Sequence, residues 1–336
     1  MRILVIKFSS IGDIILATSP LTTLRRQFPE AQIDFFTLNE YSSILEGHPH
    51  LNQILVLDRS AGYLELKKVG RHLNDLKYDL VLDLHNSIRS RIIRRRIINT
   101  EKRILMKPRW NRFKLFQFHL NHFPDQFSQL QLLHTPLKDM LGSSYNYPET
   151  SLFLSKTEKQ VTFSQLKLLN VAKEYVVIVP GAAWRQKTWS IKGYSKIVDS
   201  LEEKNISTVM LGTSTDLICK QLAQLNSKII NLQGKTNVRE SLAIISQANL
   251  VIGGDTGFVH GAEALKIPVV MIMGPTTIET GGGVNLSISK NIEVNDLWCR
   301  PCSQNGSKRC YRNEQYCMST ISSSQVFSAV QKVFLK

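Results

Sequence analysis

The sequence has no run of about 18 or more apolar residues, so we expect no helix that spans a bilayer. Its opening apolar stretch, residues 2–6, is too short for a secretory signal peptide and is followed at once by Lys7. We therefore expect a cytoplasmic protein that is soluble or attached to a membrane only peripherally.

Carboxylates are scarce compared with cations. The chain has 27 Asp and Glu against 42 Lys and Arg, which gives a formal net charge of +15. Such an excess favours a polyanionic partner: nucleic acid, an anionic membrane face or a phosphorylated acceptor. The excess is concentrated between residues 89 and 114, called the basic strip here, where Glu101 is the only carboxylate. The cations of the basic strip are Arg89, Arg91, Arg94, Arg95, Arg96, Lys102, Arg103, Lys107, Arg109, Arg112 and Lys114.

Two ligand-binding motifs are also missing. There is no Gly-x-Gly-x-x-Gly fingerprint, which argues against a dinucleotide-dependent oxidoreductase. There is no Asp-x-Asp pair to hold a divalent ion against phosphates, so we expect chemistry without a metal and assign no cofactor.

Cysteines are few, and four of the five lie close together: Cys299, Cys302, Cys310 and Cys317. Disulfides are rare in the cytosol. The Cys-x-x-Cys spacing at the start permits a structural zinc site, but the later spacings are looser than in common zinc motifs. We favour reduced thiols that pack a loop, and no metal enters the predicted site.

With 336 residues, the chain exceeds the size at which one core usually keeps growing, so two domains are expected. Short apolar runs alternate with amphipathic stretches, which is typical of βαβ units and a parallel sheet. The predicted strands are residues 2–6, 32–37, 53–57, 79–84, 103–106, 175–179, 208–211, 228–232, 250–252 and 269–273. The rhythm weakens near residues 151–172, so we predict domains 1–160 and 161–336, each a doubly wound α/β sheet. Their ligands should bind in a cleft at the carboxyl ends of the strands.

The turn of residues 7–13 (KFSSIGD) ends the first strand and opens a helix. Gly12 permits close backbone approach. Asp13 could be a plain first-turn carboxylate that the helix dipole favours. Its place at the mouth of this turn, with Lys7 behind it, also suits a base that accepts a proton from a hydroxyl group.

Two further turns suit phosphate binding. In residues 179–189 a glycine turn is followed by Arg185 and Lys187, which can contact phosphate oxygens. In residues 250–264 a strand runs into Gly-Gly-Asp-Thr-Gly, where a helix begins with unpaired N–H groups. Asp255 is an N-cap candidate in this turn, and His260 is equally compatible with a core position.

Together, residues 7–13, 181–189, 255–260 and the cysteine-rich tail resemble the heptosyltransferase family, also called glycosyltransferase family 9, over nearly the whole chain. The family builds the inner core of lipopolysaccharide. The resemblance implies the two-domain GT-B fold, whose last helix often crosses back to the first domain, and residues 322–335 suit that role.

The resemblance also implies roles for individual residues. Asp13 would be the catalytic base of an inverting transfer, while Ser9, Ser10 and Gly12 would shape the acceptor side. Around the donor, which would be ADP-heptose or a related nucleotide sugar, the diphosphate would be held by Lys187, Thr256, Gly257 and His260. Asp255 would lie near the transferred sugar.

The chain departs from the family pattern in two places. Relatives that use ADP-heptose tend to carry a ribose-binding carboxylate after the second strand of the second domain, where this chain reads residues 212–216 (GTSTD); Asp216 is its candidate replacement. The first helix also lacks a histidine that some first-heptose enzymes have. We expect Asp83, His85 and Arg89 to line the acceptor pocket, with His85 as the reserve base.

The predicted partners are a nucleotide sugar, an anionic glycolipid acceptor and, through the basic strip, the anionic inner face of the inner membrane. Three alternatives stay open: a transferase that uses another nucleotide sugar for a different glycan, a nucleotide-sugar epimerase and an inert binding subunit. A nucleic-acid-binding protein would leave the two glycine-rich helix starts unexplained, so we expect no nucleic-acid partner.

Overall fold

The computed structural model describes residues 1–142 and 146–335, and the chain divides into two compact units. The first unit comprises Met1–Pro108 and Gln129–Phe153; the second comprises Arg109–Ser128 and Leu154–Lys336. The division after residue 153 lies a few residues before the boundary that the sequence suggests. The segment of residues 109–128 packs with the second unit, which the sequence did not indicate. Among the described residues, none of the helices is both long and apolar enough to cross a membrane.

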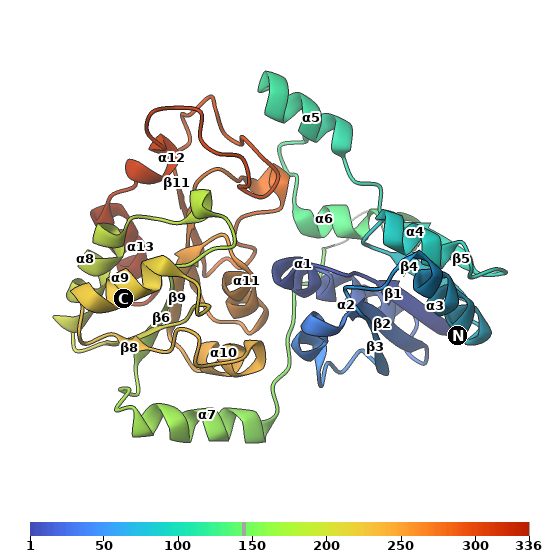
Figure 1. Ribbon diagram of the computed structural model, residues 1–336, viewed down its shortest axis with the longest axis horizontal. Helices are drawn as coiled ribbons and strands as arrows, with labels where there is room; N and C mark the ends of the chain where they lie inside the picture. Colours follow the sequence, from blue (N-terminus) through green and yellow to red (C-terminus); the bar gives the residue numbers. More distant parts are fainter. Residues whose placement is uncertain (143–145, 336) are drawn as a thin grey trace. The chain divides into compact units, whose positions relative to one another are not determined.

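The first unit is built on a five-stranded parallel sheet with the order β3-β2-β1-β4-β5 (Figure 1). Its strands are β1 (Arg2–Ile6), β2 (Gln32–Leu38), β3 (Gln53–Leu57), β4 (Leu80–Asp83) and β5 (Glu101–Ile104). Its helices are α1 (Ile11–Leu16), α2 (Thr18–Gln27), α3 (Tyr63–Asp75), α4 (Ile88–Arg94) and α6 (Gln129–His134), with 3₁₀ turns η1 (Asn39–Leu45) and η2 (Thr135–Met140).

The second unit is built on a six-stranded parallel sheet with the order β11-β10-β9-β6-β7-β8. Its strands are β6 (Tyr175–Val179), β7 (Ser207–Met210), β8 (Ile230–Asn231), β9 (Leu250–Gly254), β10 (Val269–Met273) and β11 (Lys290–Glu293). Its helices are α5 (Arg109–Phe118), α7 (Lys156–Leu168), α8 (Ile191–Glu202), α9 (Leu217–Leu225), α10 (Val238–Ile245), α11 (Gly257–Ala264), α12 (Tyr316–Ser319) and α13 (Ser323–Val333), with 3₁₀ turns η3 (Arg185–Lys187) and η4 (Ile278–Thr280).

Alternating side chains of the second sheet enter two separate cores, as expected for strands that are covered on both faces. On one face, Val176 and Ile178 of β6 pack with α8, α9 and α13. On the other face, Val177 and Val179 pack with α7, α10 and α11. The last helix, α13, thus packs against its own unit, where it contacts α8, β10 and β11.

The edge strands β5 and β11 differ most from the sequence prediction. β5 comprises residues 101–104 rather than 103–106, because its position is fixed by pairing with β4, in which Leu80 pairs with Glu101 and Asp83 with Ile104. β11, paired with β10, was not predicted. Both strands are exposed or half-buried, so neither carries the continuous apolar run that marks a buried parallel strand.

Candidate active site

The strand order of each sheet reverses at one point, and open parallel sheets bind ligands outside the carboxyl ends of the strands at that point. In the first unit the reversal lies between β1 and β4, and in the second between β6 and β9. The segments that follow these four strands contain all of the predicted site residues except Asp83, the last residue of β4, and Asp216, which follows β7.

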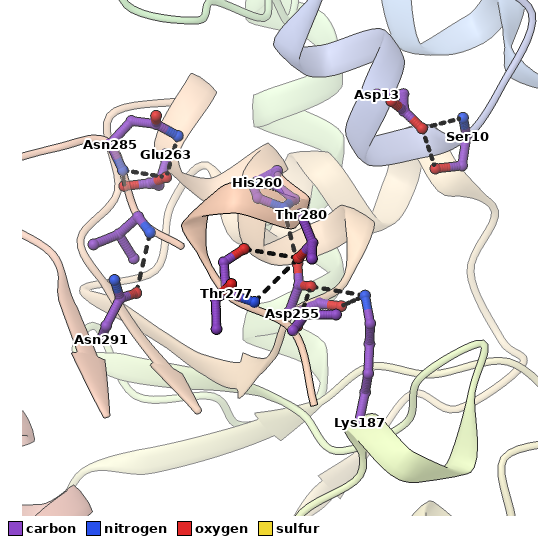
Figure 2. Close-up of polar contacts among 12 residues, drawn as sticks. Ser10, Asp13, Lys187, Asp255, His260, Glu263, Thr277, Thr280, Asn285 and Asn291 are labelled. Carbon is purple, nitrogen blue, oxygen red and sulfur yellow. Dashed lines mark hydrogen bonds and ion pairs between the residues drawn. The ribbon is translucent and has the colours of Figure 1, made fainter. Parts of the chain in front are cut away.

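In the first unit, Asp13 lies in the first turn of α1 and is held from three sides. Lys7 Nζ lies 3.0 Å from Oδ1. The backbone N–H and the hydroxyl of Ser10 donate to Oδ2 at 3.1 and 3.2 Å (Figure 2). Lys7 itself is buried, whereas the Asp13 side chain is 41% exposed. The carboxylate is therefore fixed in position and still open to a ligand. Ser9 and Gly12 flank it, half-buried and buried respectively.

Burial raises the pKa of Asp13, but the Lys7 ammonium and the hydrogen bonds from Ser10 outweigh it and hold the pKa below its ordinary value of 3.8. Asp13 is thus ionised at neutral pH, the form in which a carboxylate accepts a proton.

Asp83, at the end of β4, has a different environment from the one expected of a pocket-lining residue. It is fully buried and forms an ion pair with Arg94 of α4. Its carboxylate also accepts the backbone N–H groups of His85 at 3.0 Å and Asn86 at 2.7 Å. Asp83 therefore holds the turn after β4 in place and, being fully buried, does not line a pocket as the sequence analysis expected.

His85 packs edge-on against Phe8, with the ring centroids 5.1 Å apart, so the turns after β1 and β4 are in contact. Burial lowers the pKa of His85 to about 4, and the charges of Lys7 and Lys107 act in the same direction. Its Nδ1 is buried and has no hydrogen-bond partner within the described chain. A neutral imidazole next to Asp13 can accept a proton, which suits the role of reserve base that the sequence analysis gave to His85. Arg89 lies half-buried in the first turn of α4.

The structure corrects the interpretation of the basic strip for two of its cations. Arg94 is buried against Asp83, and Arg103 forms ion pairs with Glu101 and Asp139. These side chains stabilise the first unit and are not available as a contact surface. Arg91, Arg95 and Arg96 are exposed.

In the second unit, Asp255 is the centre of a buried polar cluster at the end of β9 (Figure 2). Its Oδ2 lies 2.7 Å from Lys187 Nζ and accepts the Thr276 hydroxyl at 2.8 Å. Its Oδ1 lies 3.2 Å from His260 Nε2. Burial raises the pKa of Asp255, but His260 and Lys187 outweigh it and hold the pKa far below the ordinary value. The cluster thus contains an ionised carboxylate beside a lysine.

Glycines let these segments approach one another. A Cβ on Gly254 would lie 2.6 Å from the carbonyl oxygen of Lys187, and one on Gly306 would lie 2.9 Å from its Cγ. Lys187 can reach Asp255 only because both positions lack a side chain.

The N-terminus of α11 lies directly beside this cluster, with Thr256 as its N-cap and Gly257 as its first residue. The Thr256 hydroxyl and His260 Nδ1 are buried and have no hydrogen-bond partner in the described part of the chain. Unpaired backbone N–H groups and a positive dipole end make such a helix start a binding place for a phosphate. The structure therefore brings Lys187, Asp255, Thr256, Gly257 and His260 together.

Asp216 lies over the neighbouring turn after β6. It is the N-cap of α9, and its Oδ2 accepts the Thr213 backbone N–H at 2.6 Å. A Cβ on Gly181 would lie only 2.5 Å from this carboxylate. The position suits a contact with a nucleotide that enters along β6. Arg185 is exposed at the start of η3 and has no described contact with the Asp255 cluster.

Sequence reasoning missed Thr276 and Arg300. Thr276 follows β10, the strand beside β9, so its position after a neighbouring strand could have pointed to it. Arg300 donates to the carbonyl oxygens of Gly274 and Thr276 and pairs with Glu293. No local pattern marks Arg300, because the carbonyl groups that it contacts belong to a turn more than 20 residues earlier in the chain.

The cysteine-rich segment packs beside Lys187, which its Gly306 approaches closely. Cys299, Cys302, Cys310 and Cys317 are free thiols that line one small pocket with Gln186 and Pro275. Burial raises the pKa of Cys317 to about 11 and also raises the pKa of Cys302. Within the described ranges, no three His, Cys, Asp or Glu side chains are placed as metal ligands. Reduced thiols that pack this loop stay the prediction, and one equivalent of zinc in the purified protein would contradict it.

Comparison with known proteins identifies a family that matches most of the chain. Residues 66–311 match the family described as glycosyltransferase family 9 (heptosyltransferase). Lipopolysaccharide heptosyltransferase 3 of Escherichia coli K12 is 27% identical over 287 residues, which cover 79% of this chain and 80% of the relative. Lipopolysaccharide heptosyltransferase 2 of the same strain is 26% identical over 303 residues, with coverage of 82% and 84%.

Solved structures show the same fold. A family 9 glycosyl transferase from Veillonella parvula DSM 2008 has a TM-score of 0.82 at 19% identity and covers 99% of this chain and 97% of its own. ADP-heptose lipopolysaccharide heptosyltransferase II of E. coli has a TM-score of 0.75 at 19% identity, with coverage of 100% and 99%. The predicted arrangement of two doubly wound domains is thereby confirmed.

Proposed function

This chain belongs to glycosyltransferase family 9, and from that premise we propose that it transfers a heptose from ADP-heptose onto the inner core of lipopolysaccharide by an inverting reaction that needs no metal. The enzyme class follows from the family. Two curated relatives are named as lipopolysaccharide heptosyltransferases, which supports the choice of sugar and acceptor. A solved relative is described as an E. coli heptosyltransferase with ADP, which supports the choice of nucleotide.

The donor is proposed to bind at the second unit. The diphosphate meets the N–H groups at the start of α11 and the ammonium of Lys187, with the Thr256 hydroxyl and His260 Nδ1 as further partners. Because Asp255 already fixes the Lys187 side chain, the ammonium is oriented before the donor arrives. Asp216, above Gly181, is the proposed partner of the ribose.

Asp13 is the observation that carries the catalytic proposal. Its carboxylate is partly exposed, ionised and fixed by Lys7 and Ser10. In the proposed step, Asp13 takes the proton of the acceptor hydroxyl while the hydroxyl oxygen bonds to the anomeric carbon and the bond to the diphosphate breaks. The electron pair of that bond leaves with the ADP. Attack from the face opposite the diphosphate inverts the configuration.

Positive charge is needed where the diphosphate departs, and Lys187 with the α11 N-terminus is proposed to supply it. Such preorganised charge substitutes for a divalent ion, so chelation with EDTA should leave the rate unchanged. Loss of activity in EDTA and its return with magnesium would contradict this part of the proposal.

The proposal is tested by incubating the protein with ADP-heptose and with lipopolysaccharide that lacks the inner-core heptose. We expect release of ADP and a product whose new glycosidic bond, read by NMR, has the opposite anomeric configuration to the donor. A parallel panel of nucleotide sugars, followed by thermal stabilisation, identifies the donor, because a tight ligand raises the melting temperature by mass action. Stabilisation by a UDP-sugar and not by ADP-heptose would contradict the choice of donor.

A further inference from the structure

Part of the basic strip forms a helix whose exposed face is aromatic. Between residues 102 and 124 the sequence has no carboxylate, and its cations there are Lys102, Arg103, Lys107, Arg109, Arg112 and Lys114. Within this stretch, α5 lies outside the layers of the second unit's sheet and helices (Figure 1).

The two faces of α5 differ sharply. Residues three, four and seven positions apart share a face of a helix. On one face, Leu115 is buried and Arg112 Nε donates to the carbonyl oxygen of Glu279 at 3.2 Å. Directly after the helix, the His119 ring contacts Trp298. These contacts fix the helix on its own unit, so its other face points outward in a defined orientation.

That outward face has three large rings. Trp110 is 66% exposed and Phe118 is 61% exposed, and Phe113 lies between them. The rings of Trp110 and Phe113 stack with centroids 5.3 Å apart, and Phe113 meets Phe118 edge-on at 5.9 Å. The rings thus form one cluster in contact with solvent.

The docking surface defined here consists of the three rings of α5, Trp110, Phe113 and Phe118, which contact one another and are all exposed. A contiguous cluster of exposed large rings marks a contact with another body. Two further exposed rings, Trp298 and Tyr311 of the cysteine-rich segment, lie 6.2 Å apart and are not counted in this surface.

The residue types of the docking surface favour a lipid bilayer as its partner. Trp and Tyr rings favour the boundary between lipid headgroups and acyl chains, and Lys and Arg beside them attract anionic lipids. Arg109 and Lys114 lie on α5 next to the exposed rings, and no carboxylate of that stretch opposes them. Another exposed apolar group, Val161, Phe163 and Leu168 on α7, shares its helix with Glu158 and shows no described ring stacking.

We propose that this docking surface binds the enzyme to an anionic lipid bilayer, with the rings inserted at headgroup depth and Arg109 and Lys114 next to lipid phosphates. The inference rests on the proposed function in one respect: the proposed acceptor is a glycolipid, which is embedded in an anionic bilayer.

The test measures binding of the full chain to sedimenting vesicles of phosphatidylglycerol and phosphatidylethanolamine, and to vesicles of phosphatidylcholine. We expect binding to the anionic vesicles that weakens as salt is added. The triple variant Trp110→Ser, Phe113→Ser, Phe118→Ser should bind roughly tenfold more weakly or worse. Arg109→Gln with Lys114→Gln should weaken binding by about tenfold at low salt and flatten its salt dependence.

The matched controls lie on α7. Val161→Ser with Phe163→Ser and Leu168→Ser removes an equal number of exposed apolar side chains, and Lys156→Gln with Lys167→Gln removes an equal charge. Both should bind vesicles as the wild type does. The proposal is overturned if the α5 and α7 variants behave alike, or if the wild type ignores anionic vesicles at low salt. It is also overturned if the wild type is a dimer that the aromatic variant converts to a monomer, since the surface would then join two copies.

Transfer to a water-soluble core oligosaccharide, freed of its lipid, separates this inference from the proposed function. The aromatic variant should retain the wild-type rate on that acceptor and lose rate only on vesicle-embedded acceptor. If the wild type transfers to neither acceptor, the proposed function is contradicted. The docking surface is then tested by the vesicle-binding measurements alone.

Discussion

At the scale of single residues, Asp13 and His85 are the two candidate bases of the first unit. Asp13 is ionised because Lys7 and Ser10 stabilise its charge, and the low pKa of His85 keeps its ring neutral. Their different partners make them separable by mutation.

Asp13→Asn should lower turnover by about 10²–10⁴-fold, the usual contribution of a positioned base. Donor affinity should change little, because the proposed donor residues belong to the second unit. Steady-state kinetics with ADP-heptose and calorimetric titration of ADP measure the two quantities. Full turnover in Asp13→Asn, together with its loss in His85→Ala, would transfer the role of base to His85.

The pH profile reports on Lys7. Asp13 must be ionised to act, and its pKa lies below 3.8, so the acid limb of kcat/KM that it causes should lie below about pH 4. Lys7→Met removes the charge that lowers this pKa, and the partial desolvation of Asp13, which raises the pKa, is then less strongly opposed. The acid limb should therefore move to higher pH by about one unit or more. An unchanged limb in the folded variant would exclude Asp13 as the titrating group.

At the scale of elements, the site depends on how turns pack between neighbouring strands. The turn after β6 lies directly under the N-cap of α9, and the turn after β4 is tied to α4 by a buried ion pair. Each packing arrangement can be tested through one residue.

Gly181→Ala should displace Asp216, because the new Cβ would lie 2.5 Å from its carboxylate. Overpacking of this kind typically costs about 1–3 kcal/mol, and the effect includes any loss of the hydrogen bond from Thr213. Urea unfolding and ADP titration should show lower stability and weaker nucleotide binding. Gly62→Ala is the control, since no described residue lies within 4 Å of the position that its new Cβ would take. Equal behaviour of the two variants would contradict the proposed approach of Asp216 to this turn.

Arg94→Ala should destabilise the first unit by about 3–5 kcal/mol, because it leaves the fully buried Asp83 carboxylate without its cation. Arg95→Ala, one residue away and exposed, should change stability by no more than about 0.5 kcal/mol. The midpoints of urea unfolding measure the difference. Indistinguishable midpoints would mean that Asp83 does not depend on Arg94.

At the scale of the whole molecule, the two compact units divide the proposed tasks, with the donor residues in one and the base in the other. Hydrogen exchange in the presence of ADP should therefore show its strongest protection in the second unit, at residues 180–187, 211–217 and 253–260. Peptides that cover residues 7–13 should gain less protection from exchange when ADP is added. Stronger protection at residues 7–13 than at residues 253–260 would contradict this division.

Much of the fold could be predicted because its signals are local. The strands β1, β3, β6 and β10 begin and end as predicted, since each contains a short apolar run that a polar or turn residue interrupts. The edge strands β5 and β11 could not be predicted in the same way, because pairing with a neighbour defines them and their own residues are mixed in character.

The candidate site was also predictable where its residues directly follow strands that the sequence indicates. The ends of β1 and β6 were predicted correctly, and the end of β9 was predicted two residues early, so the segments after these strands could be identified, with Asp13, Lys187 and Asp255 among their residues. Thr276 was missed because only its contact with Asp255 marks it. Asp83 was predicted near the end of a strand of residues 79–84, and in the structure it is the last residue of β4. Its burial against Arg94 was not predictable, since the two side chains meet only when α4 packs on the sheet.

The sequence by itself determined the two parallel sheets, the family and the turns where chemistry is expected, because periodicity, glycines and short motifs act over a few neighbouring residues. Tertiary structure alone decided which charges are held in pairs and which remain exposed. It placed Arg94 and Arg103 in ion pairs, and it turned the rings of α5 outward while fixing the opposite face of the helix. Burial depends on residues that are distant in the chain, and the cost of removing a charge from water exists only once those residues have packed around it.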